Sequence, residues 1–333
     1  MNISPLQIGA LSLRNNIALA PMAGLSDVPF RAVAWRMGAG YMVSEMVSSK
    51  VELWETGKSR QRRVPVPGVS PVAVQIAGTD PQVMAEAARR HVGEGVQIID
   101  INFGCPAKKV CRRLAGSALL GDIKLIGRIV SAVYQAVPVP ITIKTRIGLT
   151  RQDSLGIDAA CVAVDNGAQM VVMHGRSRAC KFNGAADYAP IQVLKSKVSV
   201  PVLVNGDIDS VTQAEHALSC SAADGLMIGR GALGQPWIFS ELLGRGLPSE
   251  RGKWQIILGH INAMHEFYGE ESGVRIARKH VIAYLRRMGL DAAIAAVVRS
   301  NSAQQQIDIL RRLADESCRA ATIGVINKGR VAA

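Results

Sequence analysis

The sequence predicts a (β/α)8 TIM barrel followed by a small all-helical C-terminal domain. Two observations lead to this fold class. Short apolar runs alternate with helical patterns up to about residue 245, and no strand pattern follows them. Eight alternating strand and helix units close most simply into a barrel. A doubly wound open sheet is the alternative, but it usually carries Gly-x-Gly-x-x-Gly after its first strand, where this chain has Ala20-Pro21-Met22-Ala23-Gly24.

The expected barrel strands are short apolar runs, as is typical of strands buried on both faces. They cover residues 17–22, 41–45, 72–77, 98–103, 141–146, 170–174, 202–206 and 225–229.

Helical patterns follow most of these strands. A capping residue opens several of them; Asp80, for example, precedes Pro81 at the first helical position. Glycine ends others, as at Gly38 and Gly167. The expected helices cover residues 27–37, 80–92, 122–136, 154–166, 188–195 and 210–219.

Beyond the linker-like run at 244–249, only helical patterns remain, at 254–268, 273–288 and 301–313. We therefore expect a barrel domain over residues 1–245, a helical domain over 246–316 and a weakly ordered tail over 317–333.

Composition favours a nucleic-acid partner. The formal net charge is +13 and the pI is about 9.8, and a surplus of cations attracts polyanions. No apolar run approaches the ~20 residues of a membrane-spanning helix, and no signal peptide opens the chain, so we expect a cytoplasmic protein without a membrane partner. The six cysteines form no Cys-x-x-Cys pair and the histidines show no ligand spacing, so we expect no metal.

Polar side chains stand at the carboxyl end of nearly every expected strand, directly after an apolar run. In a barrel these ends share one face, and that face carries the active site. Core packing gives no reason to place charges there, so the pattern predicts an active site. The residues are Pro21/Met22, Glu45, Gln75, Asn102/Cys105, Lys144/Arg146, His174/Arg176, Asn205/Asp207 and Gly229/Arg230.

The last two strand ends, Asn205-Gly206-Asp207 and Gly229-Arg230-Gly231, combine glycines with an arginine. Backbone amides approach anions closely at glycines, and barrels commonly bind phosphate at these two loops. Tight turns explain the glycines but not Arg230, so a phosphorylated ligand is expected there.

Basic residues form a further pattern. Arg278 and Lys279 lie on an expected helix, five basic residues fall within 50–63, and Lys108, Lys109, Arg112 and Arg113 follow Cys105. A solvated helix face explains any one of these groups, whereas together they indicate a track for a phosphate backbone.

Several segments carry a resemblance to a known family. They are Ala20-Pro21-Met22-Ala23-Gly24, Asn102-Phe103-Gly104-Cys105-Pro106-Ala107-Lys108-Lys109-Val110, Ala115-Gly116-Ser117-Ala118-Leu119-Leu120, Lys144-Thr145-Arg146, His174-Gly175-Arg176-Ser177-Arg178, Asn205-Gly206-Asp207-Ile208 and Gly229-Arg230-Gly231. In these motifs, which run in the same order across essentially the whole barrel, the chain is similar to the tRNA-dihydrouridine synthases, most closely to the bacterial B-type members.

The resemblance implies an enzyme that reduces a uridine in the D-loop of tRNA, with FMN recharged by NADPH. It implies that Cys105 is the general acid. The implied flavin-binding residues are Pro21, Met22, Ala23, Gln75, Lys144, His174, Asn205, Gly206, Asp207, Gly229 and Arg230. The implied tRNA contacts are Asn102, Lys108, Lys109, Arg176, Arg178, Arg278 and Lys279, with Asn102 positioning the uracil.

The chemistry agrees with this interpretation. Reducing the C5–C6 bond of uracil needs a hydride at one carbon, which FMN can supply, and a proton at the other. A thiol with a pKa of about 8.5 is protonated at neutral pH and can give up its proton. By itself, however, a strand-end cysteine is as often a small core residue.

Three alternatives remain open from the sequence. A flavin barrel acting on a free pyrimidine would share Lys144 and the Cys105 loop, but it would not need the basic helices. A Schiff-base aldolase would use Lys144 as its nucleophile. A non-catalytic RNA-binding barrel would not need Cys105.

Overall fold

The computed structural model describes residues 2–111 and 114–331. They divide into two compact units, one ending at Gly231 and the other beginning at Ala232. The first unit is built around a parallel sheet, and the second is helical.

Nine strands of the described chain form one parallel sheet in the order β4-β3-β11-β10-β9-β8-β7-β6-β5. The two ends of this order are joined, because Val43 bridges Ala73 and the Ser44 amide donates to the Ala73 carbonyl at 3.1 Å. The second barrel strand is therefore split into β4 and β5, and the predicted (β/α)8 barrel is confirmed. The strands are β3 (Ile17–Leu19), β4 (Tyr41–Met42), β5 (Val47–Ser48), β6 (Ala73–Ala77), β7 (Ile98–Asn102), β8 (Ile141–Arg146), β9 (Ala168–His174), β10 (Val202–Asn205) and β11 (Gly225–Ile228).

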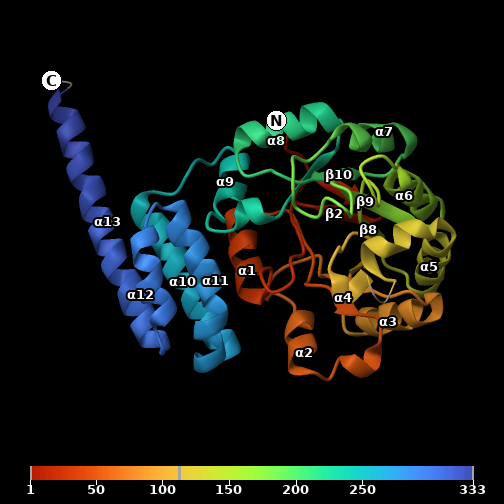
Figure 1. Cartoon of the computed structure of the whole chain (residues 1–333), viewed down its shortest axis with the longest axis horizontal. Coiled ribbons are helices and arrows are strands. Elements are labelled where there is room, and N and C mark those ends of the chain that lie inside the picture. The colour runs from red at the N-terminus through yellow and green to blue at the C-terminus, as the bar shows by residue number, and fades with distance from the viewer. Residues whose placement is uncertain (1, 112–113, 332–333) are drawn as a thin grey trace. The chain divides into compact units, whose positions relative to one another are not determined.

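Helices surround these strands (Figure 1), and several begin at the expected caps. Asp80, for example, accepts hydrogen bonds from the amides of Gln82 and Val83 at 2.9 and 3.0 Å, which satisfies two free N–H groups of the first turn. The barrel helices are α1 (Val28–Met37), α3 (Pro81–Gly93), α5 (Ile123–Ala136), α6 (Leu155–Asp165), α7 (Ala189–Lys197) and α8 (Val211–Ser221).

Shorter elements complete the first unit. An antiparallel hairpin, β1 (Leu6–Ile8) and β2 (Leu11–Leu13), precedes the barrel. Helices α2 (Gly57–Arg63) and α4 (Lys108–Cys111) lie in the loops that follow β5 and β7. Short 3-10 helices occur at Val51–Leu53, Gly116–Gly121 and Arg230–Ala232.

Side-chain alternation fills the barrel. Buried apolar residues such as Ile98, Met170, Leu203 and Met227 belong to one core cluster. Because successive strand residues face opposite sides, the residues two and four further along β7 face the same interior as Ile98. The barrel is thus apolar at one end and polar at the carboxyl end of its strands.

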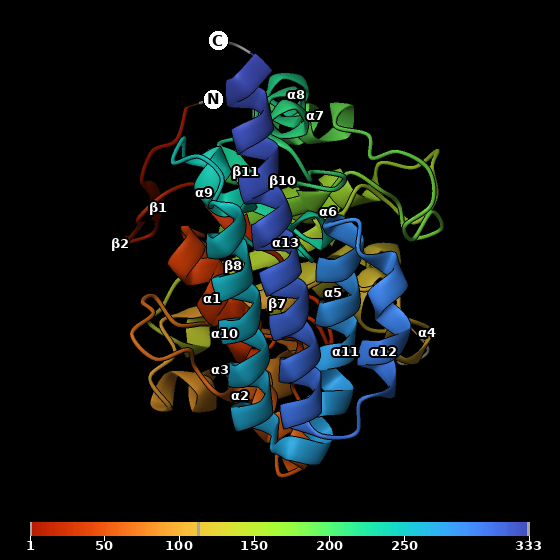
Figure 2. The same ribbon diagram turned by 90° about the vertical axis from the view of Figure 1, so that its left-hand side faces the viewer.

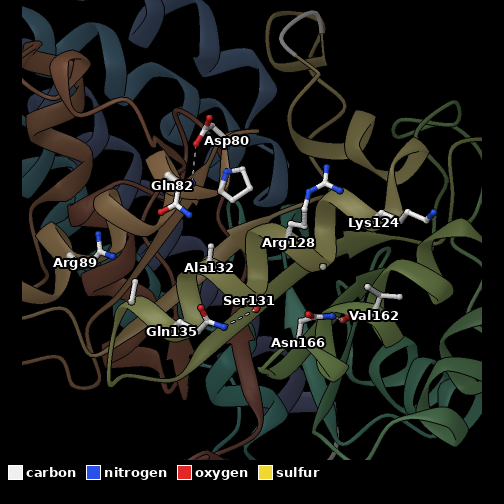
Figure 3. A pocket seen from close by; sticks show the side chains of 13 residues that line it. Asp80, Gln82, Arg89, Lys124, Arg128, Ser131, Ala132, Gln135, Val162 and Asn166 are labelled. Carbon is white, nitrogen blue, oxygen red and sulfur yellow. Dashed lines mark hydrogen bonds between the residues drawn. The ribbon is translucent and has the colours of Figure 1, made fainter.

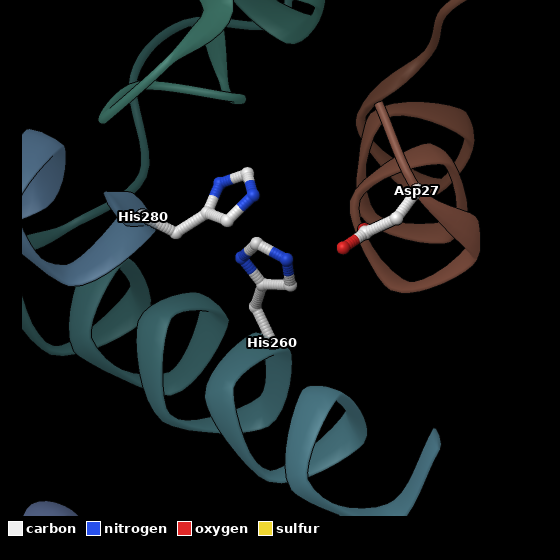
Figure 4. A group of neighbouring side chains, drawn as sticks. All are labelled: Asp27, His260 and His280. Carbon is white, nitrogen blue, oxygen red and sulfur yellow. The ribbon is translucent and has the colours of Figure 1, made fainter. Parts of the chain in front are cut away.

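The second unit contains α9 (Ile238–Leu242), α10 (Glu250–Tyr268), α11 (Glu270–Arg287), α12 (Ile294–Arg299) and α13 (Ala303–Val331), with a helical turn at Asp291–Ala293. Helices α10, α11 and α13 pack side by side (Figure 2) around buried Trp254, Ile261 and Leu285. His260 of α10 meets His280 of α11 edge to face, with ring centroids 4.8 Å apart (Figure 4). Burial, together with neighbouring Lys279, lowers the pKa of His280 to about 4, so this histidine is neutral at physiological pH.

The second unit begins earlier than the boundary expected at 245/246. The trace around Gly234 packs against α11, since a side-chain carbon at Gly234 would lie 2.3 Å from the Ala283 carbonyl oxygen. Trp237 stacks on Tyr284 with ring centroids 6.3 Å apart. The linker-like composition at 244–249 therefore marks a connection between α9 and α10 within the helical unit.

The last helix extends into the expected tail. Helix α13 continues to Val331, so residues 317–331 have helical backbone; that this tail is weakly ordered stays a prediction. No helix of the described chain is both long enough and apolar enough to span a bilayer.

Candidate active site

A cavity of about 950 Å³ opens at the carboxyl ends of the barrel strands. It lies where the polar strand ends predicted an active site, because residues of the five strands β6 to β10 and of the loops that follow β3 and β11 converge there. All the residues expected to hold a flavin line it, namely Pro21, Met22, Ala23, Gln75, Lys144, His174, Asn205, Gly206, Asp207, Gly229 and Arg230. Asn102, Cys105 and Arg176 line it as well.

A second hollow, of about 850 Å³, lies on the outer wall of the barrel. It is bordered by α3, α5 and α6, with Gln82, Arg128 and Asn166 among its polar side chains (Figure 3). Of the described residues that line it, none is a cysteine or histidine. The cavity at the strand ends is therefore the better candidate for chemistry.

Cys105 lies in the loop after β7, and hydrogen bonds hold both its backbone amide and its backbone carbonyl. Its amide donates to Oδ1 of Asn102 at 2.9 Å. Its carbonyl oxygen accepts from the amide and the hydroxyl of Ser117, at 3.1 and 2.9 Å. Gly116 has a φ of 63°, and a side-chain carbon there would lie 2.8 Å from the same carbonyl, so glycine is needed for this approach.

Burial raises the pKa of the Cys105 thiol. A backbone hydrogen bond from Ala107 and, to a smaller extent, the cations Arg146 and Lys144 lower this pKa without cancelling the effect of burial. The thiol is therefore protonated at neutral pH, and it lines the cavity. It can act as a proton donor, whereas a nucleophilic cysteine would need a lowered pKa.

Two amides connect Cys105 to the barrel interior. Nδ2 of Asn102 donates to Oε1 of Gln75 at 2.8 Å. Nε2 of Gln75 donates to Oδ2 of Asp100 at 2.7 Å. Burial raises the pKa of Asp100 to about 6, which leaves its carboxylate ionised at neutral pH.

Lys144 extends from β8 into the cavity, where its Nζ donates to Oδ1 of Asn205 at 2.9 Å. Burial, with a smaller contribution from Arg146, lowers the pKa of Lys144 to about 8. The amine is thus mostly protonated at pH 7, and it places a positive charge in a largely desolvated position.

His174 ends β9 and is 9% exposed. Burial lowers its pKa to about 2, and the nearby cations, Lys144 first, contribute in the same direction. The imidazole is consequently neutral, and it can accept or donate a hydrogen bond without adding charge.

Arg176 does not reach the solvent as expected for an RNA contact. It is 4% exposed, and its guanidinium binds the carboxylate of Asp207 and the carbonyls of Asn183 and Gly184. This placement revises our expectation, since a buried, paired arginine is not available to an RNA phosphate. The Arg176 guanidinium instead holds Asp207 and the 183–184 segment of the loop before α7 in place.

The last two strand ends leave room beside positive charge. A side-chain carbon at Gly229 would meet nothing closer than 3.7 Å, and Gly206 has a φ of 124°. The guanidinium of Arg230 lies 3.9 Å from Asp207, with half of its side chain exposed. These loops have the space and charge to accept an anionic group.

The loop at Met22 is held by a carboxylate that the sequence marked only as a polar strand end. Glu45 is 5% exposed and accepts from the Gly24 amide. It also lies 3.6 Å from Nε of Arg62. Arg62 therefore has a partner within the protein. Arg63 has one as well, because it binds Glu94 and lies over the Trp54 ring. Two of the five basic residues at 50–63 thus have structural roles.

Three residues that line the cavity, and one buried residue behind them, were missed or given no role from the sequence. Asp100 lay hidden in an apolar run, although a carboxylate within a buried strand is itself a signal. Arg146 donates to the Gly104 carbonyl at 2.8 Å and so supports the loop of the thiol. Lys181 and Phe182 line the cavity, and the guanidinium of Arg230 lies 4.7 Å from the Phe182 ring centre; no sequence pattern distinguishes these two.

The remaining expected RNA contacts are dispersed. Arg178 is not among the residues that line the cavity. The side chains of Lys108 and Lys109 lie outside the described part of the structure, as do Arg112 and Arg113. In the helical unit Lys279 is exposed, whereas Arg278 is half-buried and donates to the Ser300 carbonyl at 3.0 Å.

Comparison with known proteins gives a consistent result. Residues 18–320 match the family described as Dihydrouridine synthase (Dus). The chain is 46% identical over 325 residues to the tRNA-dihydrouridine synthase B of Pseudomonas syringae pv. tomato, covering 95% of this chain and 96% of that one. It is 48% identical over 314 residues to that of Vibrio cholerae, covering 92% and 97% of the two chains.

Two solved structures are similar in fold. Histamine dehydrogenase from a Rhizobium species aligns with a TM-score of 0.57 and 13% identity over 78% of this chain and 50% of that chain. An old yellow enzyme homologue from Zymomonas mobilis aligns with a TM-score of 0.52 and 14% identity over 74% and 93%. At these identities the likeness concerns the barrel alone.

Proposed function

Because the chain belongs to the dihydrouridine synthase family, we propose that it reduces the C5–C6 double bond of a D-loop uridine in tRNA, using bound FMN and NADPH as the reductant. The observation that carries the proposal is the pairing of a protonated thiol, Cys105, with a buried ammonium group, Lys144, in one cavity. The cavity volume, about 950 Å³, lies near the top of the range of about 300–1,000 Å³ for small-molecule sites.

The residues present fit FMN. The phosphate would lie at Gly229 and Arg230, where space and positive charge coincide, with Gly206 in the adjoining loop that also lines the cavity. The ring would lie against Pro21, Met22 and Ala23, within reach of the Gln75 amide and the Lys144 ammonium. The four cations around His174, which are Lys144, Arg146, Arg176 and Arg230, suit a cofactor that carries a phosphate.

When bound, the flavin supplies the hydride that one carbon of the uracil double bond receives. The chain's own contribution is the proton for the other carbon, from Sγ of Cys105. Asn102 uses one Nδ2 hydrogen for Gln75, which leaves the second to bind a uracil carbonyl. Lys144 supplies positive charge where negative charge develops, which is worth most in a desolvated site.

The helical unit offers a surface for tRNA. Arg275, Lys279 and Arg286 fall on one exposed face of α11 at helical spacing. From residue 246 onward the chain has 13 basic and 8 acidic residues, a net charge of +5. Such a face can bind phosphates without reading sequence. We assign the tRNA contact to this face, with Lys279 retained and Arg278 removed from the predicted set.

A cytoplasmic location is part of the same proposal, since tRNA is the substrate. The coenzyme preference for NADPH is carried over from the family resemblance. The absence of a metal also stays a prediction.

The decisive test compares substrates. Purified protein is given NADPH and either unmodified tRNA transcript or free uracil, and the products are analysed by mass spectrometry. We expect one uridine of the tRNA D-loop to gain two hydrogen atoms while uracil is unchanged. Reduction of free uracil alone would favour the free-pyrimidine enzyme. Borohydride trapping of a carbonyl substrate on Lys144, in a protein without flavin absorbance, would favour the aldolase.

A test in cells complements this assay. Transfer RNA from a strain that lacks the gene is compared with tRNA from the same strain carrying the wild-type protein. We expect one dihydrouridine to be missing in the deletion strain and restored by the protein. An unchanged dihydrouridine pattern in the deletion strain would refute the proposed activity.

A further inference from the structure

Asp100 is a buried carboxylate to which neither the sequence patterns nor the proposed reaction gives a role. It lies in the middle of β7 and is 1% exposed. Each of its oxygens accepts one hydrogen bond, Oδ2 from Nε2 of Gln75 at 2.7 Å and Oδ1 from Oγ1 of Thr142 at 2.6 Å. Burying a carboxylate is costly even when both oxygens are satisfied, so this position calls for an explanation.

The direction of the hydrogen bonds between Asp100 and Cys105 provides one. Oδ1 of Asn102 accepts from the amides of Gly104 and Cys105 at 3.2 and 2.9 Å, so this side chain must turn its NH2 group toward Gln75. Gln75 must then receive that group on Oε1 and turn its own NH2 away. Only an acceptor can satisfy it at the far end, and that acceptor is Asp100.

We propose that Asp100 is a positioning residue that fixes the orientation of the Gln75 and Asn102 amides and thereby holds the backbone of Cys105 in place for proton donation. An amide flip at either residue would place two donors face to face. With the flip excluded, each of these cavity-lining amides keeps its second N–H available to a ligand. The proposal rests on the proposed function for the role of Cys105 as the acid.

The test measures how firmly the Cys105 loop is held, without relying on turnover. The purified full-length protein is saturated with FMN and treated with iodoacetamide, and alkylation of Cys105 is followed by peptide mass spectrometry. Asp100→Leu removes the acceptor while keeping a similar volume. We expect Cys105 to be alkylated about tenfold faster in this variant, the effect of losing one net hydrogen bond from the set that holds the loop.

A conservative variant should restore the wild-type behaviour. In Asp100→Asn the amide oxygen can accept from Gln75, while its NH2 donates to the Thr142 hydroxyl. We therefore expect Cys105 alkylation within about twofold of the wild-type rate. Alkylation as fast as in Asp100→Leu would overturn the proposal, because the negative charge, and not the acceptor, would then be responsible.

Tyr41→Phe is the matched control for disturbance of the barrel core. The Tyr41 hydroxyl lies 3.4 Å from Thr142 Oγ1, at the opposite end of the hydrogen-bonded path from Cys105. Its loss should leave the alkylation rate unchanged, and an acceleration equal to that of Asp100→Leu would overturn the proposal. If Asp100→Leu fails to fold by circular dichroism, Gln75→Met breaks the same path at its middle and should accelerate alkylation likewise.

A folded Asp100→Leu or Gln75→Met variant with wild-type alkylation at Cys105 would also overturn the proposal. A double variant, Asp100→Leu with Asn102→Ala, should be alkylated no faster than Asn102→Ala alone, since Asp100 acts through Asn102. The outcome is separable from the proposed function. If the wild-type protein makes no dihydrouridine but the alkylation pattern is as expected, only the proposed function fails.

Discussion

Lys144 and Asn205 are joined across the carboxyl end of the barrel by a hydrogen bond of 2.9 Å from Nζ to Oδ1. Asn205 is itself fixed, because its Nδ2 donates to the Met227 carbonyl at 2.7 Å. The bond therefore connects β8 through β10 to β11 and holds the lysine in one position. A flexible, strongly hydrated side chain becomes a fixed charge.

This fixed charge makes the reaction sensitive to alkaline pH. Lys144 has its pKa lowered to about 8, so it is charged below that pH and loses its charge as the pH rises through it. We expect the rate of flavin reoxidation by tRNA to fall above about pH 8. Stopped-flow absorbance in single-turnover experiments between pH 6 and pH 10 measures this rate.

Two substitutions separate charge from shape at this position. Lys144→Met should lower the reoxidation rate by ~10²–10³ below about pH 8, where the wild-type amine is charged, and by less at higher pH. Lys144→Arg keeps a charge throughout the range and should flatten the alkaline fall. A profile for Lys144→Arg that still falls near pH 8 would assign the titration to another group.

Cys105→Ala should abolish proton donation while leaving the flavin in place. We expect the rate of tRNA reduction to drop by ~10²–10⁴, the usual contribution of a general acid, with flavin content and flavin reduction by NADPH close to wild type. Cys161→Ala is the matched control, because Cys161 lies on α6 and is not among the residues lining the cavity. Equal activities in the two variants would show that the thiol is not the acid.

The barrel could be predicted from the sequence because its strands are buried on both faces. Apolar runs such as 98–103 and 141–146 coincide with β7 and β8 almost residue for residue. Polar groups directly after such runs have to lie on one face of a barrel, which is why the cavity lining was largely predictable. The split between β4 and β5 was not, since it depends on the long-range bridge from Val43 to Ala73.

The missed and revised residues share a physical cause. Whether an arginine contacts RNA or a buried partner depends on the three-dimensional surroundings, and Arg176 and Arg278 both found internal acceptors. Asp100 was overlooked because a single charge within an apolar run does not alter the strand pattern. Its partners, Gln75 and Thr142, come from neighbouring strands far away in the chain.

The two glycines that flank Arg230 should respond differently to alanine. A side-chain carbon at Gly231 would lie 2.0 Å from the Ile208 carbonyl oxygen, whereas the nearest atom to one at Gly229 would be Cβ of Ala20, at 3.7 Å. Gly231→Ala should therefore lower the free energy of unfolding by ~1–3 kcal/mol, the usual cost of overpacking. Urea denaturation measures this change.

Gly229→Ala should leave stability close to wild type but weaken FMN binding, because the added methyl group occupies space assigned to the phosphate. Fluorescence titration of the flavin-free protein with FMN tests this. The same titration with riboflavin, which lacks the phosphate, should show a smaller difference between variant and wild type. Equal weakening for both ligands would contradict the phosphate assignment of these loops.

The exposed face of α11 should contribute salt-dependent affinity for tRNA. Lys279 is exposed, and the Arg275 side chain is 60% exposed, so neither is needed for folding. We expect the double variant Lys279→Ala and Arg275→Ala to bind tRNA more weakly. The slope of the logarithm of the association constant against the logarithm of the salt concentration should become shallower by about 1 to 2, because each phosphate contact contributes about 0.7–0.9 to it. Fluorescence anisotropy with labelled tRNA at several salt concentrations measures the slope, and an unchanged slope would place the tRNA elsewhere.

Arg278→Ala is the contrasting variant, because it removes the donor to the Ser300 carbonyl. It should lower thermal stability while leaving the salt slope of the folded protein unchanged.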